Sequence, residues 1–183
     1  MPLEFLTPTE QNPEHRQALL NLQTEYMAWV MDGVQALTGQ TPEALLGCSL
    51  TDYVLNSLPK VCAQRPPQGQ FYLLREGDAW LGMGGLRPLS SLRPNCAEIK
   101  RLYLRPACRG RGLGQQLLAR LLADAQAFGY ERVLLDSAPF MQAAHRIYRA
   151  AGFQDCPAYA GVEVPQALHP QWHFMALNLP QRA

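Results

Sequence analysis

The chain has no long hydrophobic run, and this absence excludes a first large class of proteins. No apolar stretch among the 183 residues approaches the ~18 consecutive apolar residues that a membrane-spanning helix requires. Residues Met1 to Glu4 carry no basic group ahead of an apolar stretch, so a secretory signal is not expected. We predict a cytoplasmic protein that does not enter a membrane.

Paired metal-binding motifs are also missing. The five cysteines are odd in number, scattered and never spaced as Cys-x-x-Cys, so they predict free thiols and no zinc site. No two of the four histidines have His-x-x-x-His spacing on one expected helix, and no acid pairs with them, so we expect no metal.

A large excess of charge is missing as well. The formal net charge of +1 argues against a general nucleic-acid binder. With 48% hydrophobic residues and 17% charged residues, the composition is that of a packed protein and not of a disordered one. The length suits one core, so we predict a single domain over residues 1–183. The oligomeric state stays open, with a homodimer among the possibilities.

The most informative segment is a strand that stops at a proline and turns through a basic, glycine-rich loop into an amphipathic helix. Residues Glu98 to Gly114 read Glu-Ile-Lys-Arg-Leu-Tyr-Leu-Arg-Pro-Ala-Cys-Arg-Gly-Arg-Gly-Leu-Gly. Backbone N–H groups at a helix start have no intrahelical partner, and the helix dipole adds roughly half a positive charge there. Glycines let an anion approach the main chain, and Arg109 and Arg111 add permanent charge. The segment therefore predicts a site for a phosphorylated ligand.

Three better-known motifs do not fit this sequence. A Walker loop needs Lys-Ser/Thr after its last glycine, whereas Gln115 and Gln116 follow Gly114. The dinucleotide fingerprint is G-x-G-x-x-G, whereas the spacing here is G-x-G-x-G. The Gly-x-Ser-x-Gly motif of serine hydrolases is absent.

The segment Arg109-x-x-Gly112-x-Gly114 resembles the acyl-coenzyme A pyrophosphate loop of the GNAT superfamily of N-acetyltransferases, whose pattern is Gln/Arg-x-x-Gly-x-Gly/Ala. Residues Glu98 to Pro106 resemble the central strand of that family. Residues Ala143 to Phe153 resemble its later helix, with a tyrosine and a Gly-Phe ending. The likeness is specific from about Phe71 to Phe153.

The hydrophobic patterns predict the same α/β fold as the resemblance, a mixed, mostly antiparallel sheet of about seven strands with about four helices in the order β-α-α-β-β-β-α-β-α-β-β. Strands are expected at residues 3–6, 71–75, 79–87, 96–104, 132–136, 153–156 and 172–179. Helices are expected after Asn12, Thr41, Ser49, the glycine-rich loop and Pro139. The first should be weakened near Gly33, and the third should end near Pro59.

The resemblance also implies how acetyl-CoA binds. In the family, the fourth and fifth strands separate, and the pantetheine arm pairs with the main chain of the fourth, which here gives Leu102, Tyr103 and Leu104. The pyrophosphate loop corresponds to Arg109, Gly110, Arg111, Gly112, Leu113 and Gly114. Many relatives carry an asparagine after the fifth strand, and Ser137 is the candidate to replace it.

Two residues are the catalytic candidates. Glu98 is the only acid on the predicted fourth strand and shares strand alternation with Leu102 and Leu104, so it is the candidate base that deprotonates an amine. A salt bridge to Lys100 or to an arginine is the alternative role. Tyr148 would protonate the leaving thiolate, or would be a core residue whose hydroxyl has a hydrogen-bond partner.

We therefore predict an acetyl-CoA-dependent N-acetyltransferase that acts on a primary amine of a small molecule or peptide by direct attack in a ternary complex. A non-catalytic acyl-CoA-binding module is the alternative from another class. Transfer of a longer acyl group would depend on room near Gly82 to Gly85. The acceptor pocket would come from the first two helices and residues 157–171, where no chemical signature stands out.

Overall fold

The strands in the described part of this chain form one seven-stranded sheet in the order β1-β2-β3-β4-β5-β7-β6. The computed structural model describes residues 2–93 and 95–180. The strands are β1 (Leu3–Leu6), β2 (Gln70–Glu76), β3 (Ala79–Leu89), β4 (Cys96–Leu104), β5 (Arg132–Ser137), β6 (Gln154–Asp155) and β7 (His173–Asn178). The helices are α1 (Pro13–Thr38), α2 (Pro42–Leu46), α3 (Leu50–Cys62), α4 (Leu113–Ala127) and α5 (Gln142–Ala150).

The sheet is mixed, as predicted, because β4 and β5 are parallel whereas the other neighbouring pairs are antiparallel. The described residues form five α-helices, in agreement with the predicted fold, and the helix expected after Thr41 is α2, which has five residues. The Thr41 side chain accepts a hydrogen bond from the first turn of α2, so the helix begins there, and Gly47 ends it in a left-handed backbone conformation.

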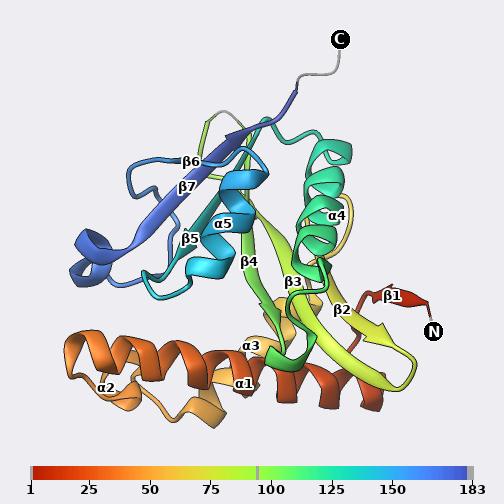
Figure 1. Ribbon diagram of the computed structural model, residues 1–183, viewed down its shortest axis with the longest axis horizontal. Coiled ribbons are helices and arrows are strands. Elements are labelled where there is room, and N and C mark those ends of the chain that lie inside the picture. Colours follow the sequence, from red (N-terminus) through yellow and green to blue (C-terminus); the bar gives the residue numbers. More distant parts are fainter. Residues whose placement is uncertain (1, 94, 181–183) are drawn as a thin grey trace.

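The two faces of the sheet are covered by different helices. Along β2, Tyr72 and Leu74 pack in one hydrophobic cluster with residues of α4, whereas Phe71 and Leu73 pack in another with residues of α1 and α3. This alternation follows from the two-residue period of a strand. In Figure 1, α1, α2 and α3 lie together beneath the strands, and α4 and α5 lie in front of them.

Helix α1 begins where the sequence predicts and is not weakened at Gly33. The Asn12 side chain accepts hydrogen bonds from the backbone N–H groups of Glu14 and His15, and the helix continues to Thr38. A Cβ at Gly33 would lie 2.3 Å from the ring of Phe140, so the glycine allows close packing instead of breaking the helix. No helix in the described part of the chain is both long and apolar enough to cross a membrane.

Two other helix boundaries differ from the prediction. Helix α3 continues through Pro59 to Cys62, because Val61 in its last turn packs in the core and proline removes only one donor. Helix α5 begins at Gln142 and not at Pro139. The intervening residues form a turn in which the N–H of Met141 donates to the carbonyl of Ala138 at 3.0 Å.

Candidate functional site

Strands β4 and β5 separate part of the way along their length. Their pairing ends at Glu98 and Leu134, although β4 continues to Leu104 and β5 to Ser137. The later part of β4 therefore has no partner strand on this side. A gap between parallel strands leaves main-chain hydrogen-bonding groups free to pair with an extended ligand.

A bulge in β4 changes which side chains share a face. Between the pairs Gly85–Lys100 and Met83–Tyr103, β4 contains one more residue than β3, and Arg101 has a φ of 55°. Leu102 and Leu104 therefore join the cluster of α4, and Tyr103 joins that of α1. The predicted alternation of Glu98 with Leu102 and Leu104 was wrong, because the extra residue inverts the faces.

A groove of about 800 Å³ lies between the free part of β4, the glycine-rich loop and α5. Eight of the ten predicted coenzyme residues line it, namely Leu102, Tyr103, Leu104, Arg109, Gly110, Gly112, Leu113 and Gly114. The opposite wall is formed by Trp29, Phe140 and residues of α5, including Ala144 and Ile147. The volume falls within the range of small-molecule and cofactor sites.

The glycine-rich loop has the conformation that an anion site needs. Gly110 and Gly112 have φ values of 77° and 74°, and Gly112 caps α4 without any side-chain hydrogen bond to its first turn. The helix therefore presents free N–H groups at this end. Among the described residues, a Cβ at Gly112 would approach nothing closer than Gln115 Oε1, at 3.6 Å.

Arg109 connects the loop to the floor of the groove. Its Nε donates to the carbonyl of Leu104 at 3.2 Å, and its guanidinium lies 5.5 Å from the ring centroid of Trp29. These contacts hold a permanent positive charge beside the loop.

The other two predicted coenzyme residues do not line this groove. Arg111 bonds Glu76 at 2.7 Å, on the β2–β3 hairpin. Ser137 is buried, with its Oγ 3.0 Å from Nε2 of His145 and 3.5 Å from the sulfur of Met141. Its hydroxyl therefore belongs to the packing between β5 and α5.

Tyr148 lies on the buried face of α5 and is only 6% exposed. Its ring contacts Phe153, with ring centroids 5.9 Å apart. Burial raises the pKa of its phenol, and so do Tyr26 on α1 and Asp136 on β5. The hydroxyl is thus a neutral donor near the end of β5. The neighbouring residue, Ile147, lines the groove.

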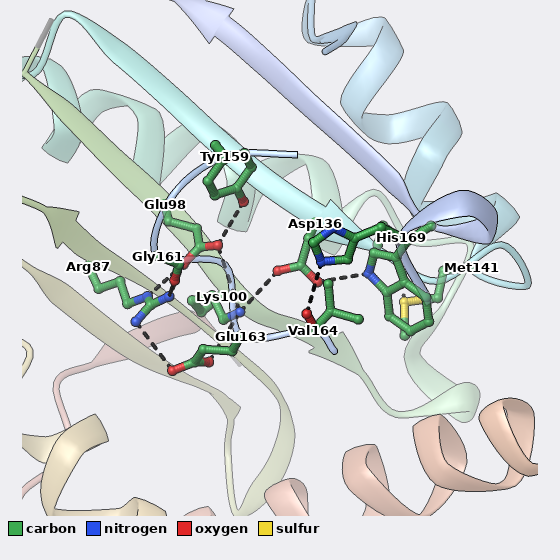
Figure 2. A network of polar contacts seen from close by, with 12 residues as sticks. Arg87, Glu98, Lys100, Asp136, Met141, Tyr159, Gly161, Glu163, Val164 and His169 are labelled. Atoms are coloured by element: carbon green, nitrogen blue, oxygen red, sulfur yellow. Dashed lines mark hydrogen bonds and ion pairs between the residues drawn. The ribbon is translucent and has the colours of Figure 1, made fainter. Parts of the chain in front are cut away.

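Glu98 lies at the centre of a buried polar network (Figure 2). Its carboxylate accepts a hydrogen bond from Arg87 Nε at 2.5 Å and one from the Tyr159 hydroxyl at 2.7 Å. The side chain has no exposed surface. Burial raises the pKa of Glu98, although Lys100 and Arg87 oppose the increase.

The network continues across the gap through Lys100. Its Nζ lies 3.1 Å from Asp136 and 3.3 Å from Glu163. Burial alone would lower the pKa of Lys100, but these carboxylates and Glu98 hold it above the ordinary lysine value. On the far side, Trp172 Nε1 donates to Asp136 at 2.9 Å.

Three members of this network were not singled out from the sequence, namely Asp136, Tyr159 and Glu163, whereas Lys100 was named as a possible ion-pair partner of Glu98 and lies 3.9 Å from it. The position of Asp136 near the carboxyl end of a buried strand was the one available signal. Tyr159 and Glu163 lie in the irregular segment before β7, where no periodicity marks a residue. Within residues 2–93 and 95–180, no three His, Cys, Asp or Glu side chains are grouped so that they could hold a metal ion.

Comparison with known proteins agrees with this geometry. A sequence profile described as "Acetyltransferase (GNAT) family" matches residues 35–153. The chain is 30% identical over 128 residues to "Uncharacterized N-acetyltransferase YjgM" of Escherichia coli, which covers 70% of this chain and 74% of that protein.

Solved structures show the same fold at low sequence identity. The PaiA N-acetyltransferase of Thermoplasma acidophilum, in complex with coenzyme A, matches with a TM-score of 0.70 and 15% identity, over 98% of this chain and 100% of that one. A spermidine N-acetyltransferase of Vibrio cholerae, with CoA and spermine, has a TM-score of 0.62 and 14% identity, over 96% and 95% of the two chains.

Proposed function

The chain belongs to the acetyltransferase (GNAT) family, and from that premise we propose that it transfers an acetyl group from acetyl-CoA to a primary amine of a small molecule or peptide. The observation that carries the proposal is the groove at the strand gap, where eight of the ten predicted coenzyme residues meet. The amine attacks directly, within a ternary complex.

Different parts of the groove are suited to different parts of acetyl-CoA. The pyrophosphate is assigned to the N–H groups at the start of α4 and to Arg109. The pantetheine arm is assigned to the main chain of Leu102, Tyr103 and Leu104, where β4 has no partner strand. Arg111 and Ser137 are assigned supporting roles, since Arg111 bonds Glu76 and Ser137 bonds His145. Coenzyme A is present in both similar structures named above.

The chemistry needs a proton acceptor and a proton donor. The amine nitrogen forms a bond to the acetyl carbon as the carbon–sulfur bond breaks, so one proton must leave the amine and one must reach the sulfur. Glu98 is assigned to the first transfer and Tyr148 to the second. The elevated pKa of the Glu98 carboxyl makes it a better proton acceptor than a surface carboxylate.

Burial constrains how these two groups act. Arg87 and Tyr159 occupy the two oxygens of Glu98, so the proposed transfer from the amine is indirect and passes through an intervening water. Tyr148 is protonated at neutral pH, as a tyrosine of ordinary pKa is, and burial raises its pKa further. Its hydroxyl therefore carries the proton that the proposed transfer to a thiolate beside α5 requires, although the raised pKa makes it a weaker acid than an exposed tyrosine.

The test combines binding with turnover. Calorimetry should show that the purified protein binds acetyl-CoA, and a panel of amines, amino acids and peptides should reveal an acceptor by release of the coenzyme thiol. Gly112→Asp should remove both activities in a folded protein. Normal binding by that variant would contradict the assigned coenzyme site.

A further inference from the structure

A second, smaller hollow lies on the α3 side of the sheet, beside the same strand gap. Its volume is about 310 Å³, and it is bounded by α3, β2, β3, β4 and the segment before β7. We call it the basic hollow, because its charged lining residues are Lys60, Arg87, Lys100, Arg101 and a single acid, Glu163. Phe71 and Val61 supply an apolar wall.

Two of the four cations are already neutralised by carboxylates. Arg87 pairs with Glu98 and Glu163, and Lys100 pairs with Asp136 and Glu163. Figure 2 shows Glu163 between Arg87 and Lys100. These pairs fix the wall of the hollow and leave little charge there for a ligand.

The other two cations have no such partner. Among the described residues, neither Arg101 nor Lys60 forms an ion pair with a carboxylate within 4.0 Å, although the charge of Arg101 contributes to lowering the pKa of Glu163. Arg101 is only partly exposed, so its charge is more effective than that of a freely solvated side chain. The hollow therefore has a small surplus of positive charge.

Arg101 is held in a strained backbone conformation. Its φ of 55° is the sole positive value at a described residue other than glycine, and this region is unfavourable for a residue with a Cβ. Glycine would form the β4 bulge without that strain. The presence of arginine at this strained position indicates a role for its side chain in ligand binding, because strained residues concentrate at ligand sites.

The basic hollow also adjoins the assigned reaction centre. Arg101 immediately precedes Leu102, whose main chain is assigned to the pantetheine arm, and Lys100 bridges the gap to Asp136. The basic hollow and the coenzyme groove are therefore lined by consecutive residues of β4, beside the gap between β4 and β5.

We propose that the basic hollow binds a carboxylate of the acceptor, so that the substrate class is a small primary amine that bears a carboxylate. The inference rests on the proposed function and adds Arg101 as a specificity-determining residue. The planar guanidinium of Arg101 pairs with a carboxylate through two hydrogen bonds. One carboxylate matches the small surplus of charge, and the volume lies at the lower end of the small-molecule range.

The experiment separates this inference from the proposed function by measuring binding without turnover. The protein is saturated with coenzyme A, which carries no acetyl group. It is then titrated with two matched pairs, L-phenylalanine against L-phenylalaninamide and 4-aminobutanoate against 4-aminobutanamide, by ligand-observed NMR. We expect at least one acid to bind about tenfold more tightly than its amide.

Substitutions at Arg101 test whether this residue causes the preference for the acid over its amide. Arg101→Met should abolish it, whereas Arg101→Lys, which has the same Cβ and a positive charge, should retain part of it. Arg16→Met removes an exposed arginine of α1 that lines neither hollow and should change nothing. Equal binding of acid and amide, no binding of either acid, or a preference that survives in Arg101→Met would overturn the inference.

Turnover of the same pairs with acetyl-CoA is measured in parallel. Acetylation of the amides as fast as the acids, without a binding preference, would leave the proposed function standing and overturn the carboxylate site. A binding preference that depends on Arg101, without acetylation of any amine, would support the carboxylate site and count against the proposed function.

Discussion

Lys100 and Asp136 join strands β4 and β5 two residues beyond the point where the main chains stop pairing. The last backbone partners are Glu98 and Leu134, and the Lys100 and Asp136 side chains then meet at 3.1 Å. Trp172, just ahead of β7, donates to the same carboxylate. A side-chain contact thus limits how far the strands separate beside the coenzyme groove.

Breaking this bridge should destabilise the protein. Asp136→Asn keeps the shape of the side chain but removes the charge that faces Lys100, and both side chains are largely buried, at 12% and 21% exposure. We expect the free energy of unfolding to fall by about 1–3 kcal/mol, as for loss of a partly buried charged hydrogen bond. Denaturant unfolding measures the loss.

A double-mutant cycle with Lys100→Met provides the control. If the two side chains interact, the effects of Asp136→Asn and Lys100→Met should not add. Additive effects would show that the bridge contributes nothing to stability.

Gly112→Asp should abolish acetyl-CoA binding and leave the fold intact. The φ of 74° is tolerated by aspartate better than by most residues, and the added side chain has open space. Its negative charge would face the pyrophosphate at the start of α4. Gly112→Asn imposes the same backbone demand without the charge, so it should retain much more affinity by calorimetry. Equal affinities of the two variants would refute the electrostatic explanation.

Glu98→Gln should lower kcat/KM on the order of a hundredfold near neutral pH if Glu98 receives the amine proton. Activity should partly recover at higher pH, because more of the acceptor is then unprotonated. The measurement is a pH–rate profile of the variant beside the wild type.

A stability measurement must accompany that profile, because Glu98 also pairs with Arg87. Tyr159→Phe is the matched control, since it removes one hydrogen bond to Glu98 and keeps the carboxylate. A folded Glu98→Gln enzyme with an unchanged pH–rate profile would assign the residue to structure alone.

Tyr148→Phe removes a single hydroxyl and keeps the contact of the ring with Phe153. If Tyr148 protonates the thiolate, kcat should fall about a hundredfold, and the KM for acetyl-CoA should change little. The defect should shrink with an acyl donor whose thiol leaves more easily. Wild-type kcat in the variant, where chemistry is shown to limit turnover, would leave protonation to solvent.

His145 should make stability depend on pH. Burial lowers its pKa, as does the nearby His173, although a backbone bond to Ala138 opposes this. Arg149 and Asp155 act weakly and in opposite directions. The unfolded state takes up the proton more readily than the folded state does. The contribution of neutral His145 to the free energy of unfolding should therefore be fully present above pH ~6.5, and it should be lost as the pH drops through the folded-state pKa. His145→Gln should flatten this dependence in unfolding curves at several pH values, and an equally steep dependence would exclude His145 as its source.

Features that depend on neighbours in the chain were predictable from the sequence. The strand, the turn and the glycine-rich start of α4 lie within one short segment, so the sequence predicted that Arg109, Gly110 and Gly112 lie together, and all three line the groove. The caps at Asn12, Thr41 and Ser49 were predictable for the same reason, because each bonds N–H groups two or three residues away.

Features that depend on tertiary packing could not be predicted from the sequence. Pro59 did not end α3, because Val61 of the same helix packs in the core, and Gly33 did not weaken α1, because Phe140 packs against it. The bulge at Arg101 also has no local signal, since glycine would be the expected residue at its φ.

The sequence by itself determined the family and the order of helices and strands along the chain, and it predicted the glycine-rich loop as a phosphate site, because each rests on short-range pattern and spacing. Only the tertiary structure decided that Glu98 is buried between Arg87 and Tyr159, and that Lys100 bridges to Asp136. Those partners lie between 11 and 61 residues apart in the chain. Side-chain contacts of that kind arise when the strands and the segment before β7 are packed together, and no local periodicity encodes them.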